Sequence, residues 1–260
     1  ALRALARPTS DISFLEALGV DIVQGDVLDA ASVQAAVRGC DYVVHAAALF
    51  RLWGPSEPFI NTNVNGTHNV LEAALAAGVK RFIHISTVIV VGPQKPGVVI
   101  TEEIPCWPYA TDNYAQTKFL GERLAQSYVC KSLPVVILRL GALYGPYGHY
   151  AFNRLFFEEF LHNWRAQVHQ GRHIIFPCYV GDAAKTIEAA LTLGQVGQIY
   201  NVSNKSISHK EANQTVSRLA KRSSWRINFP GWLMIEFARL LEFIALFTHR
   251  EPFYPKNLEP

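Results

Sequence analysis

Three short segments of the chain are largely apolar and do not alternate apolar with polar residues. They are DYVVHA (41–46), RFIHIS (81–86) and PVVILRL (134–140), and helical patterns separate them. A strand with apolar side chains on both faces must be covered on both faces, which helices connecting parallel strands achieve. The sequence therefore predicts an α/β fold in which helices cover both faces of a parallel sheet.

The remaining elements continue this alternation as far as the strand that ends at Leu140. Further strands are predicted at 2–5, 21–24 and 197–203, and helices at 14–19, 30–38, 64–77 and from 111 onward. After Gly141 the pattern becomes turn-rich and then aromatic, and a hairpin is expected around His169 and His173. We expect residues 1–145 to form one core and 146–260 a smaller, mostly helical lobe. One or more strands of the lobe would return to the sheet.

Composition excludes some classes of protein. The net charge is +3 with no run of Lys or Arg, which disfavours nucleic-acid binding. The four cysteines are scattered without C-x-x-C spacing, as in a cytoplasmic protein with reduced thiols. No third ligand accompanies His169 and His173, so no metal site is predicted.

The longest apolar stretch, residues 232–247, contains Glu236, Arg239 and Glu242. Three charges argue against a membrane span, and the apolar residues recur with helical spacing. They are Leu233, Phe237, Leu240, Leu241, Ile244 and Phe247. The prediction is an amphipathic helix that packs on a core or substrate pocket. A helix lying on a membrane surface is the alternative.

Tyr114 and Lys118 lie four residues apart within a predicted helix and therefore share one of its faces. The pair by itself fits an ordinary surface contact. It also fits a phenol whose pKa is altered by the neighbouring ammonium group. Other motifs surround it: Ser86 and Thr87 end a strand, and VVHAAA (43–48) follows another strand with three small residues. Small side chains there would let a flat ligand approach the backbone.

In order and spacing, seven motifs resemble those of the extended short-chain dehydrogenase/reductases, the NAD-dependent epimerase/dehydratase family. The motifs are GDVLD, VVHAAA, NVNGT, HIST, YAQTK, LRLGALYGP and YVGDAA. The resemblance covers nearly the whole chain and implies a Rossmann-type fold with a C-terminal substrate lobe. Two shorter stretches, FRLWGP and HREPF, are similar to hopanoid-associated sugar epimerases and dihydroflavonol reductase-like or 3β-hydroxysteroid dehydrogenase-like members.

The resemblance implies three catalytic residues. Tyr114 would be the general acid/base, Thr87 would hydrogen-bond the reacting oxygen, and Lys118 would favour the phenolate. Lys118 would also hold the nicotinamide ribose. Ser86 is the second, less favoured hydroxyl at the same strand end.

The resemblance also implies a set of cofactor contacts, each of which has an ordinary structural alternative such as a helix cap or tight packing. The set is Arg7, Asp26, Val27, Ala46, Ala47, Ala48, Asn63, Ser86, Tyr114, Lys118 and Gly141. Arg7 closes the first strand, where an acidic residue would favour NAD, and a guanidinium suits the 2′-phosphate of NADP instead. The expected cofactor is NADP or NAD, with NADP preferred.

Two departures from the family pattern affect these expectations. The chain lacks the family's first strand and its glycine-rich turn, so we expect it to be a fragment of a longer protein. Val88 and Ile89 follow Thr87 where sugar-nucleotide 4,6-dehydratases carry an acidic pair, which disfavours dehydration.

The expected function is an NAD(P)-dependent oxidoreductase or epimerase acting on a sugar nucleotide or another small substrate. A catalytically silent nucleotide-binding scaffold and a membrane-peripheral sterol or lipid dehydrogenase are the alternatives. The expected partner is a small-molecule substrate, and a homodimer is left open.

Overall fold

The computed structural model describes residues 1–95, 97–148, 152–158, 166–224, 227–248 and 251–252. These residues divide into two compact units. The first comprises residues 1–50, 55–138 and 187–200, and the second comprises residues 51–54, 139–186 and 201–260.

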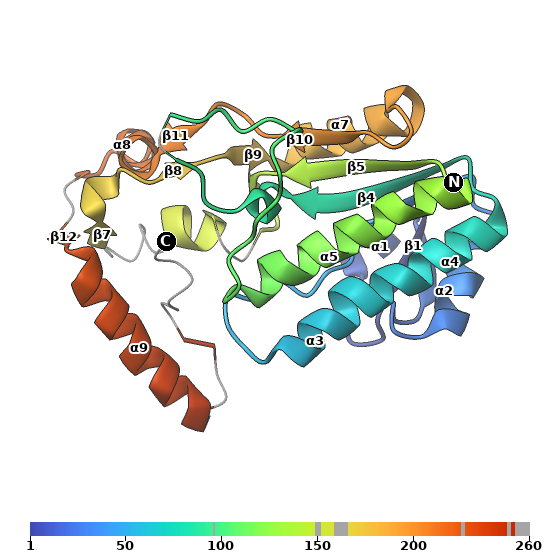
Figure 1. The fold of residues 1–260 in the computed structure, drawn as a ribbon, viewed down its shortest axis with the longest axis horizontal. Coiled ribbons are helices and arrows are strands. Elements are labelled where there is room, and N and C mark those ends of the chain that lie inside the picture. The colour runs from blue at the N-terminus through green and yellow to red at the C-terminus, as the bar shows by residue number, and fades with distance from the viewer. Residues whose placement is uncertain (96, 149–151, 159–165, 225–226, 249–250, 253–260) are drawn as a thin grey trace. The chain divides into compact units, whose positions relative to one another are not determined.

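Strands and helices alternate along the first unit, as the apolar runs predict (Figure 1). Its elements are β1 (Arg3–Ala6), α1 (Ser13–Ala17), β2 (Asp21–Gln24), α2 (Ala30–Val37), β3 (Tyr42–His45), α3 (Ser56–Ile60), α4 (Thr67–Ala77), β4 (Arg81–Thr87) and α5 (Asn113–Ser127). Strands β5 (Val135–Leu140) and β10 (Ile199–Val202) continue from it into the second unit.

Four strands form one sheet in the order β10-β5-β4-β3, and β1 and β2 form a separate pair. β3 runs parallel to β4, with Tyr42 opposite Arg81, and β1 runs parallel to β2, with Arg3 opposite Asp21. Because β3 and β4 are parallel, the chain must cross over between them, and helix α4 forms part of that crossover, which confirms the predicted Rossmann-type α/β class.

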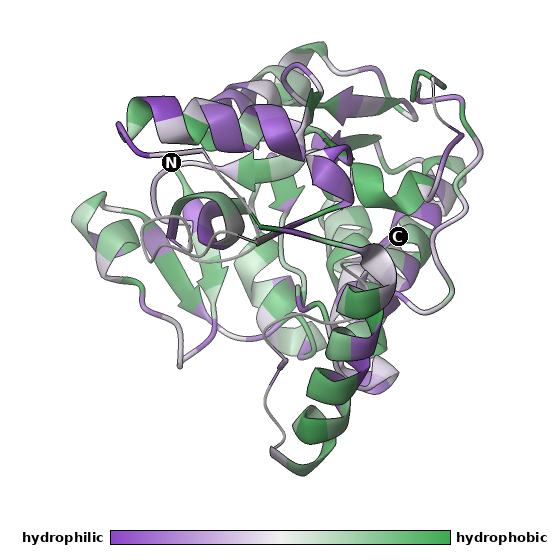
Figure 2. Ribbon diagram, turned by 90° about the vertical axis from the view of Figure 1, so that its left-hand side faces the viewer, coloured by the Kyte–Doolittle hydropathy of each residue, from purple (hydrophilic) through white to green (hydrophobic). Residues whose placement is uncertain are grey.

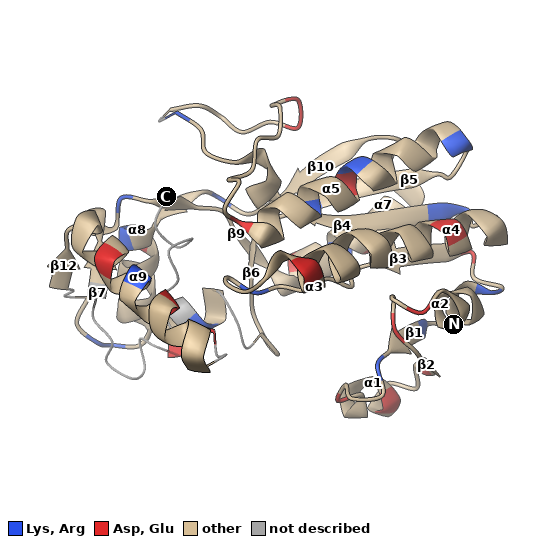
Figure 3. Ribbon diagram, turned by 60° about the horizontal axis from the view of Figure 1, so that its bottom comes forward, with Lys and Arg blue, Asp and Glu red and all other residues tan. Residues whose placement is uncertain are grey.

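Helix α5 begins where its sequence predicts. The side chain of Asp112 accepts a hydrogen bond from the backbone N–H of Ala115 at 3.0 Å, which caps the helix N-terminus. α5 packs beside α4, and both basic and acidic residues occur along α5 (Figure 3). Its inward face carries Lys118 and Glu122, both buried. A helix that turns two charges inward must supply partners for them.

The core of the first unit lies between β4, β5 and the helices α2, α4 and α5. Its fully buried members include Leu71, Phe82, Tyr128 and Ile137. Complete burial of one such side chain contributes about 1.5–3 kcal/mol to stability. This core fixes β4 and α5 against each other and so positions the residues at the end of β4.

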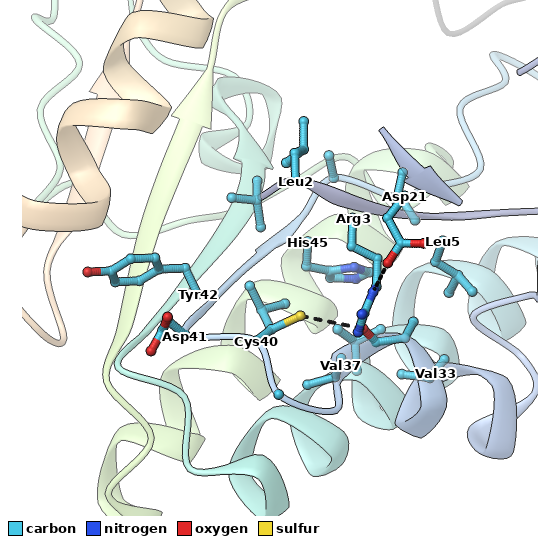
Figure 4. Close-up of a pocket in the computed structure, with 18 of the residues that line it drawn as sticks. Leu2, Arg3, Leu5, Asp21, Val33, Val37, Cys40, Asp41, Tyr42 and His45 are labelled. Atoms are coloured by element: carbon cyan, nitrogen blue, oxygen red, sulfur yellow. Dashed lines mark hydrogen bonds and ion pairs between the residues drawn. The ribbon is translucent and has the colours of Figure 1, made fainter. Parts of the chain in front are cut away.

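A cavity of about 890 Å³ separates β1 from β3 (Figure 4). Leu2, Arg3 and Leu5 line it on one side, and Tyr42 and His45 of β3 line it on the other. Arg3 also donates hydrogen bonds from Nη1 to the carbonyls of Ala36 (3.2 Å) and Arg38 (2.9 Å). β1 is therefore tied to α2 and its C-terminal end.

The second unit contains several short strands together with helices. Beyond the ends of β5 and β10, it holds β6 (Ala142–Tyr144), β7 (Ala166–Val168), β8 (Ile174–Ile175), β9 (Pro177–Tyr179), the start of α7 (Val180–Leu193), β11 (Ile207–Ser208), α8 (His209–Leu219), β12 (Ile227–Phe229) and α9 (Gly231–Thr248). A small aromatic core forms around Phe152, Phe156 and Ala212.

The hairpin predicted around His169 and His173 is wrong. β7 pairs in parallel with β12, and β8 pairs antiparallel with β11, so the two strands flanking these histidines do not pair with each other. Both partner strands lie more than thirty residues further along the chain. Their distance explains why a local pattern could not identify them.

The prediction for residues 232–247 is right about the helix and wrong about its buried face. α9 spans Gly231–Thr248, and its buried residues are Gly231, Met234, Ala238 and Ala245. Among these buried residues Gly231, Ala238 and Ala245 are small and Met234 is large. Within the predicted stripe Leu241 is half-buried and the other five apolar side chains are exposed, and Figure 2 shows α9 as strongly hydrophobic. No helix within the described residues has the length and apolar character needed to cross a membrane.

Candidate active site

Thr87 and Tyr114 meet at the C-terminal end of β4. Thr87 is the last residue of that strand, and Tyr114 lies in the first turn of α5. Their side chains hydrogen-bond to each other. Phe50, from the segment after β3, covers the Tyr114 ring with a centroid separation of 4.6 Å. The structure therefore brings together a hydroxyl and a phenol from distant parts of the sequence, beneath an aromatic side chain.

Lys118 lies one helical turn after Tyr114 and is only 5% exposed. Its Nζ donates a hydrogen bond to the backbone carbonyl of Ile85 on β4 at 2.6 Å. Burial lowers the pKa of the Lys118 ammonium to about 8, and the charge of Glu122 opposes this effect. The amine is therefore mostly charged at neutral pH but close to its titration range.

The phenol of Tyr114 holds its proton firmly in this structure. Burial raises its pKa, the Asp112 carboxylate raises it further, and the hydrogen bond with Thr87 lowers it. The expected effect of Lys118 on this pKa is not among these influences, because the ammonium points to the Ile85 carbonyl. Tyr114 is thus arranged as a proton donor.

Ser86 directs its side chain into the interior. Its Oγ donates a hydrogen bond to Oε2 of Glu122 at 2.6 Å, and both residues are buried. The two hydroxyls at the end of β4 therefore have different surroundings. Thr87 pairs with Tyr114, and Ser86 pairs with a carboxylate of α5.

Two histidines lie near Lys118 on neighbouring strands. His45 of β3 and His84 of β4 are buried with ring centroids 5.7 Å apart, and Nε2 of His45 lies 2.9 Å from Oγ1 of Thr67. Burial and the Lys118 charge lower the pKa of His45 to about 3 and the pKa of His84 well below its usual value. Both rings are neutral at pH 7. His45 is a packed strand residue.

Asn63 connects the segment after β3 to α5. Its amide accepts a hydrogen bond from the Leu49 N–H at 2.7 Å and donates to the Leu49 carbonyl at 3.1 Å and to Thr117 Oγ1 at 3.0 Å. A side chain on Gly121 would lie 2.6 Å from the Asn63 carbonyl, so glycine allows this close approach. These contacts fix Leu49, and hence the adjacent Phe50.

We expect Asn63→Ala to lower the free energy of unfolding by about 2–3 kcal/mol, because it removes three hydrogen bonds and leaves the part-buried backbone groups of Leu49 without this partner. Urea denaturation followed by circular dichroism measures this loss. Asn65→Ala is a matched control on the same π-helical turn, since Asn65 is exposed and its amide bonds only to Asn61 among the contacts described. Equal effects of the two substitutions would contradict the bracing role.

Three of the predicted cofactor contacts line the cavity between β1 and β3. They are Val27, Ala46 and Ala47, and small or apolar side chains there leave the backbone accessible. The Asp26 carboxylate accepts a hydrogen bond from the Leu28 N–H at 3.0 Å, which shapes the turn after β2. The residues that line the cavity do not include Thr87, Tyr114 or Lys118.

Three other predicted cofactor contacts, Ala48, Arg7 and Gly141, are not among the residues that line this cavity. Ala48 continues the exposed segment after β3, and Arg7 is exposed directly after β1. Gly141 belongs to the second unit, where its N–H bonds to the Val202 carbonyl at 2.8 Å and a side chain would collide with Phe176. Gly141 thus has a packing reason to be glycine.

Two residues of the site escaped the sequence analysis. Glu122 carries a signal that could have identified it, because an acidic residue four positions after Lys118 shares its helix face. Phe50 carries no such signal. Its contact with Tyr114 depends on how Asn63 holds the preceding residue, which spacing along the sequence does not reveal.

Comparison with known proteins gives one family. The model of the NAD dependent epimerase/dehydratase family matches residues 2–203. The low-salt glycan biosynthesis protein Agl12 of Haloferax volcanii is 31% identical over 214 residues, covering 80% of this chain and 68% of that protein. The 2-alkyl-3-oxoalkanoate reductase of Shewanella oneidensis is 29% identical over 205 residues, covering 73% of this chain and 52% of that protein.

A solved structure is also similar to this chain. DesIV, a dTDP-glucose 4,6-dehydratase from Streptomyces venezuelae crystallised with NAD, is 26% identical with a TM-score of 0.78, covering 88% of this chain and 74% of that chain. The present chain spans about half to two thirds of the length of the first curated relatives that it matches. On the family match, which covers most of the chain, the protein belongs to the NAD dependent epimerase/dehydratase family.

Proposed function

We propose that the protein is an NAD(P)-dependent oxidoreductase or epimerase with Tyr114 as its acid/base. The hydrogen bond between Thr87 and Tyr114, with Lys118 buried one turn away, carries this proposal. A protein that only binds a nucleotide does not require that arrangement, which argues against the silent-scaffold alternative. The substrate is a sugar nucleotide or another small molecule with a hydroxyl-bearing carbon or ketone.

Each residue has a defined role in the mechanism. Tyr114 donates its proton to the carbonyl oxygen of a ketone substrate, and Thr87 hydrogen-bonds the same oxygen and orients it. Phe50 packs against the Tyr114 ring, and Lys118 carries its positive charge one helical turn away on α5. A bound nicotinamide dinucleotide supplies or accepts the hydride. In the reverse direction Tyr114 must first lose its proton, so oxidation is expected to accelerate as pH rises.

Val27, Ala46 and Ala47 would hold the adenosine part of the cofactor and Lys118 the nicotinamide ribose. Val88 and Ile89 follow Thr87 without a carboxylate, so the site has no acid there to eliminate water. The reaction is therefore hydride and proton transfer without dehydration. Turnover of nucleoside-diphosphate sugars and of alkyl ketones, measured by cofactor absorbance, tests this function. Activity on neither class with either cofactor would contradict it.

An apolar substrate is the second candidate. The exposed large side chains of α9, including Trp232, Leu240, Phe243 and Phe247, favour it. A membrane-peripheral enzyme acting on a sterol or lipid ketone would use such a surface to reach its substrate. Co-flotation with liposomes distinguishes this candidate from an enzyme for soluble sugar nucleotides.

We further propose that the cofactor is NADP, and we expect Arg7→Ala to weaken NADPH binding by about ten- to a hundredfold, because a charged hydrogen bond to the 2′-phosphate is lost. NADH binding should change little. Titration of intrinsic fluorescence measures both affinities. Arg38→Ala removes the same charge from an exposed position after α2 and should affect neither. Tighter binding of NADH than of NADPH by the unaltered protein would contradict the preference.

A further inference from the structure

We propose that Glu122 is a positioning residue: a buried counter-charge that, together with Ser86, holds Lys118 against β4 and keeps its ammonium charged. This inference rests on the proposed function, in which Lys118 acts on the reacting centre. Glu122 itself touches neither the phenol nor Thr87 in the contacts described. Its effect on the reaction would pass through Lys118.

The two buried charged side chains of α5 bond to consecutive residues of one strand, Ile85 and Ser86 of β4. Lys118 and Glu122 are one turn apart on α5, and they are 5% and 3% exposed. Lys118 bonds to the Ile85 carbonyl at 2.6 Å, and Glu122 accepts from the Ser86 hydroxyl at 2.6 Å. Two adjacent anchoring points on β4 restrict α5 from sliding or rotating. Lys118 therefore keeps a fixed position relative to Thr87, the next residue of the strand.

The charges around Lys118 explain why a counter-charge is needed. An isolated ammonium in a buried site loses its hydration and tends to release its proton. The titratable groups that interact with Lys118 are Glu122 on α5, His84 on β4 and His45 on β3. The two histidines are neutral at pH 7 and supply no negative charge. Glu122 opposes the effect of burial on Lys118, and Asp112 acts on Tyr114 in the first turn of the same helix.

Glu122→Gln tests the charge separately from the hydrogen bond. The glutamine oxygen can still accept from the Ser86 hydroxyl, so the substitution removes the negative charge and retains the shape. We expect the pKa of Lys118 to fall by about one unit, and the alkaline limb of kcat/KM to move to lower pH by the same amount. NMR of protein labelled at lysine Cε measures the first quantity directly. The spectrum of Lys118→Met assigns the resonance.

Two further variants distinguish the effect of the Glu122 charge on the Lys118 pKa from the effect of the hydrogen bond between Ser86 and Glu122. Ser86→Ala removes the hydrogen bond and retains the carboxylate, so the pKa of Lys118 should move less than in Glu122→Gln. Glu122→Asp keeps the charge and should restore most of the pKa. An unchanged Lys118 pKa in Glu122→Gln, or an equal shift in Ser86→Ala, would overturn the proposal. Thermal melts of each variant verify that the compared proteins are folded.

The NMR measurement separates this inference from the proposed function. A shifted Lys118 resonance in a protein that reduces or oxidises no substrate would support the counter-charge and contradict the enzyme. Activity with an unshifted resonance would support the enzyme and contradict the counter-charge. A shifted resonance together with a shifted pH profile supports both.

Discussion

Replacing Tyr114 with phenylalanine is expected to reduce turnover by about a hundred- to ten-thousandfold, the usual contribution of a positioned acid or base. The ring remains, so its contact with Phe50 at 4.6 Å between centroids should persist. Only the proton donor and its hydrogen bond with Thr87 are lost. Cofactor affinity should be nearly unchanged. Steady-state kinetics together with cofactor titration measure both effects.

Thr87→Val is the matched control for this experiment. It removes the hydroxyl that meets the phenol and retains the shape, so it should lower turnover less than Tyr114→Phe does. In the oxidation direction the rate should rise with pH, because the raised pKa of Tyr114 keeps the phenol protonated over the neutral range. Near-normal turnover by Tyr114→Phe would show that another group transfers the proton.

Lys118 should make the folded protein more stable as pH rises from about 8 to about 10. The folded-state pKa of this lysine is about 8 and its ordinary value is 10.5. Between these values the unfolded chain binds the proton and the folded protein does not, so the free energy of unfolding increases with pH. The increase attributable to this one group is about 2 kcal/mol over that range.

Urea unfolding of the unaltered protein and of Lys118→Met, at several pH values in this window, isolates the effect. The difference between the two free energies should grow with pH, because methionine cannot titrate. The raised pKa values of Tyr114 and Tyr128 contribute in the opposite direction as pH approaches the ordinary tyrosine value of 10.0, and comparing the two proteins at the same pH removes this shared contribution. A difference that stays constant with pH would mean that Lys118 titrates normally. Lys118→Met should also lose turnover by orders of magnitude.

The sequence was sufficient to predict the alternation of strands and helices, because buried parallel strands are apolar throughout and their helices have recognisable caps. Asp112 is an example, since aspartate is a preferred N-cap residue and its side chain caps α5. The helix predicted at 64–77 begins later, since Asn61–Gly66 forms a π-helical turn from which Asn63 makes its three buried bonds. No propensity scale anticipates a turn imposed by such contacts.

Part of the candidate site was also predictable. Tyr114 and Lys118 share one face of a predicted helix and Thr87 follows a predicted strand, and the roles proposed for them come from the family resemblance. The pKa values were not predictable, because they depend on burial and on where each group points. Lys118 turns to the Ile85 carbonyl, which a sequence cannot show. The exposed face of α9 was missed for a related reason, since helical spacing identifies an apolar face without showing whether it is covered.

The cavity between β1 and β3 bears on how the stability of the first unit depends on a bound cofactor. Asp26 and Val27 follow the β1–β2 pair, and Ala46 and Ala47 follow the four-stranded sheet, so the residues proposed for the adenosine belong to two separate sheets. A dinucleotide held by both would bridge them. Its binding free energy would then add to the resistance of this region to unfolding, and the melting temperature would depend on cofactor concentration.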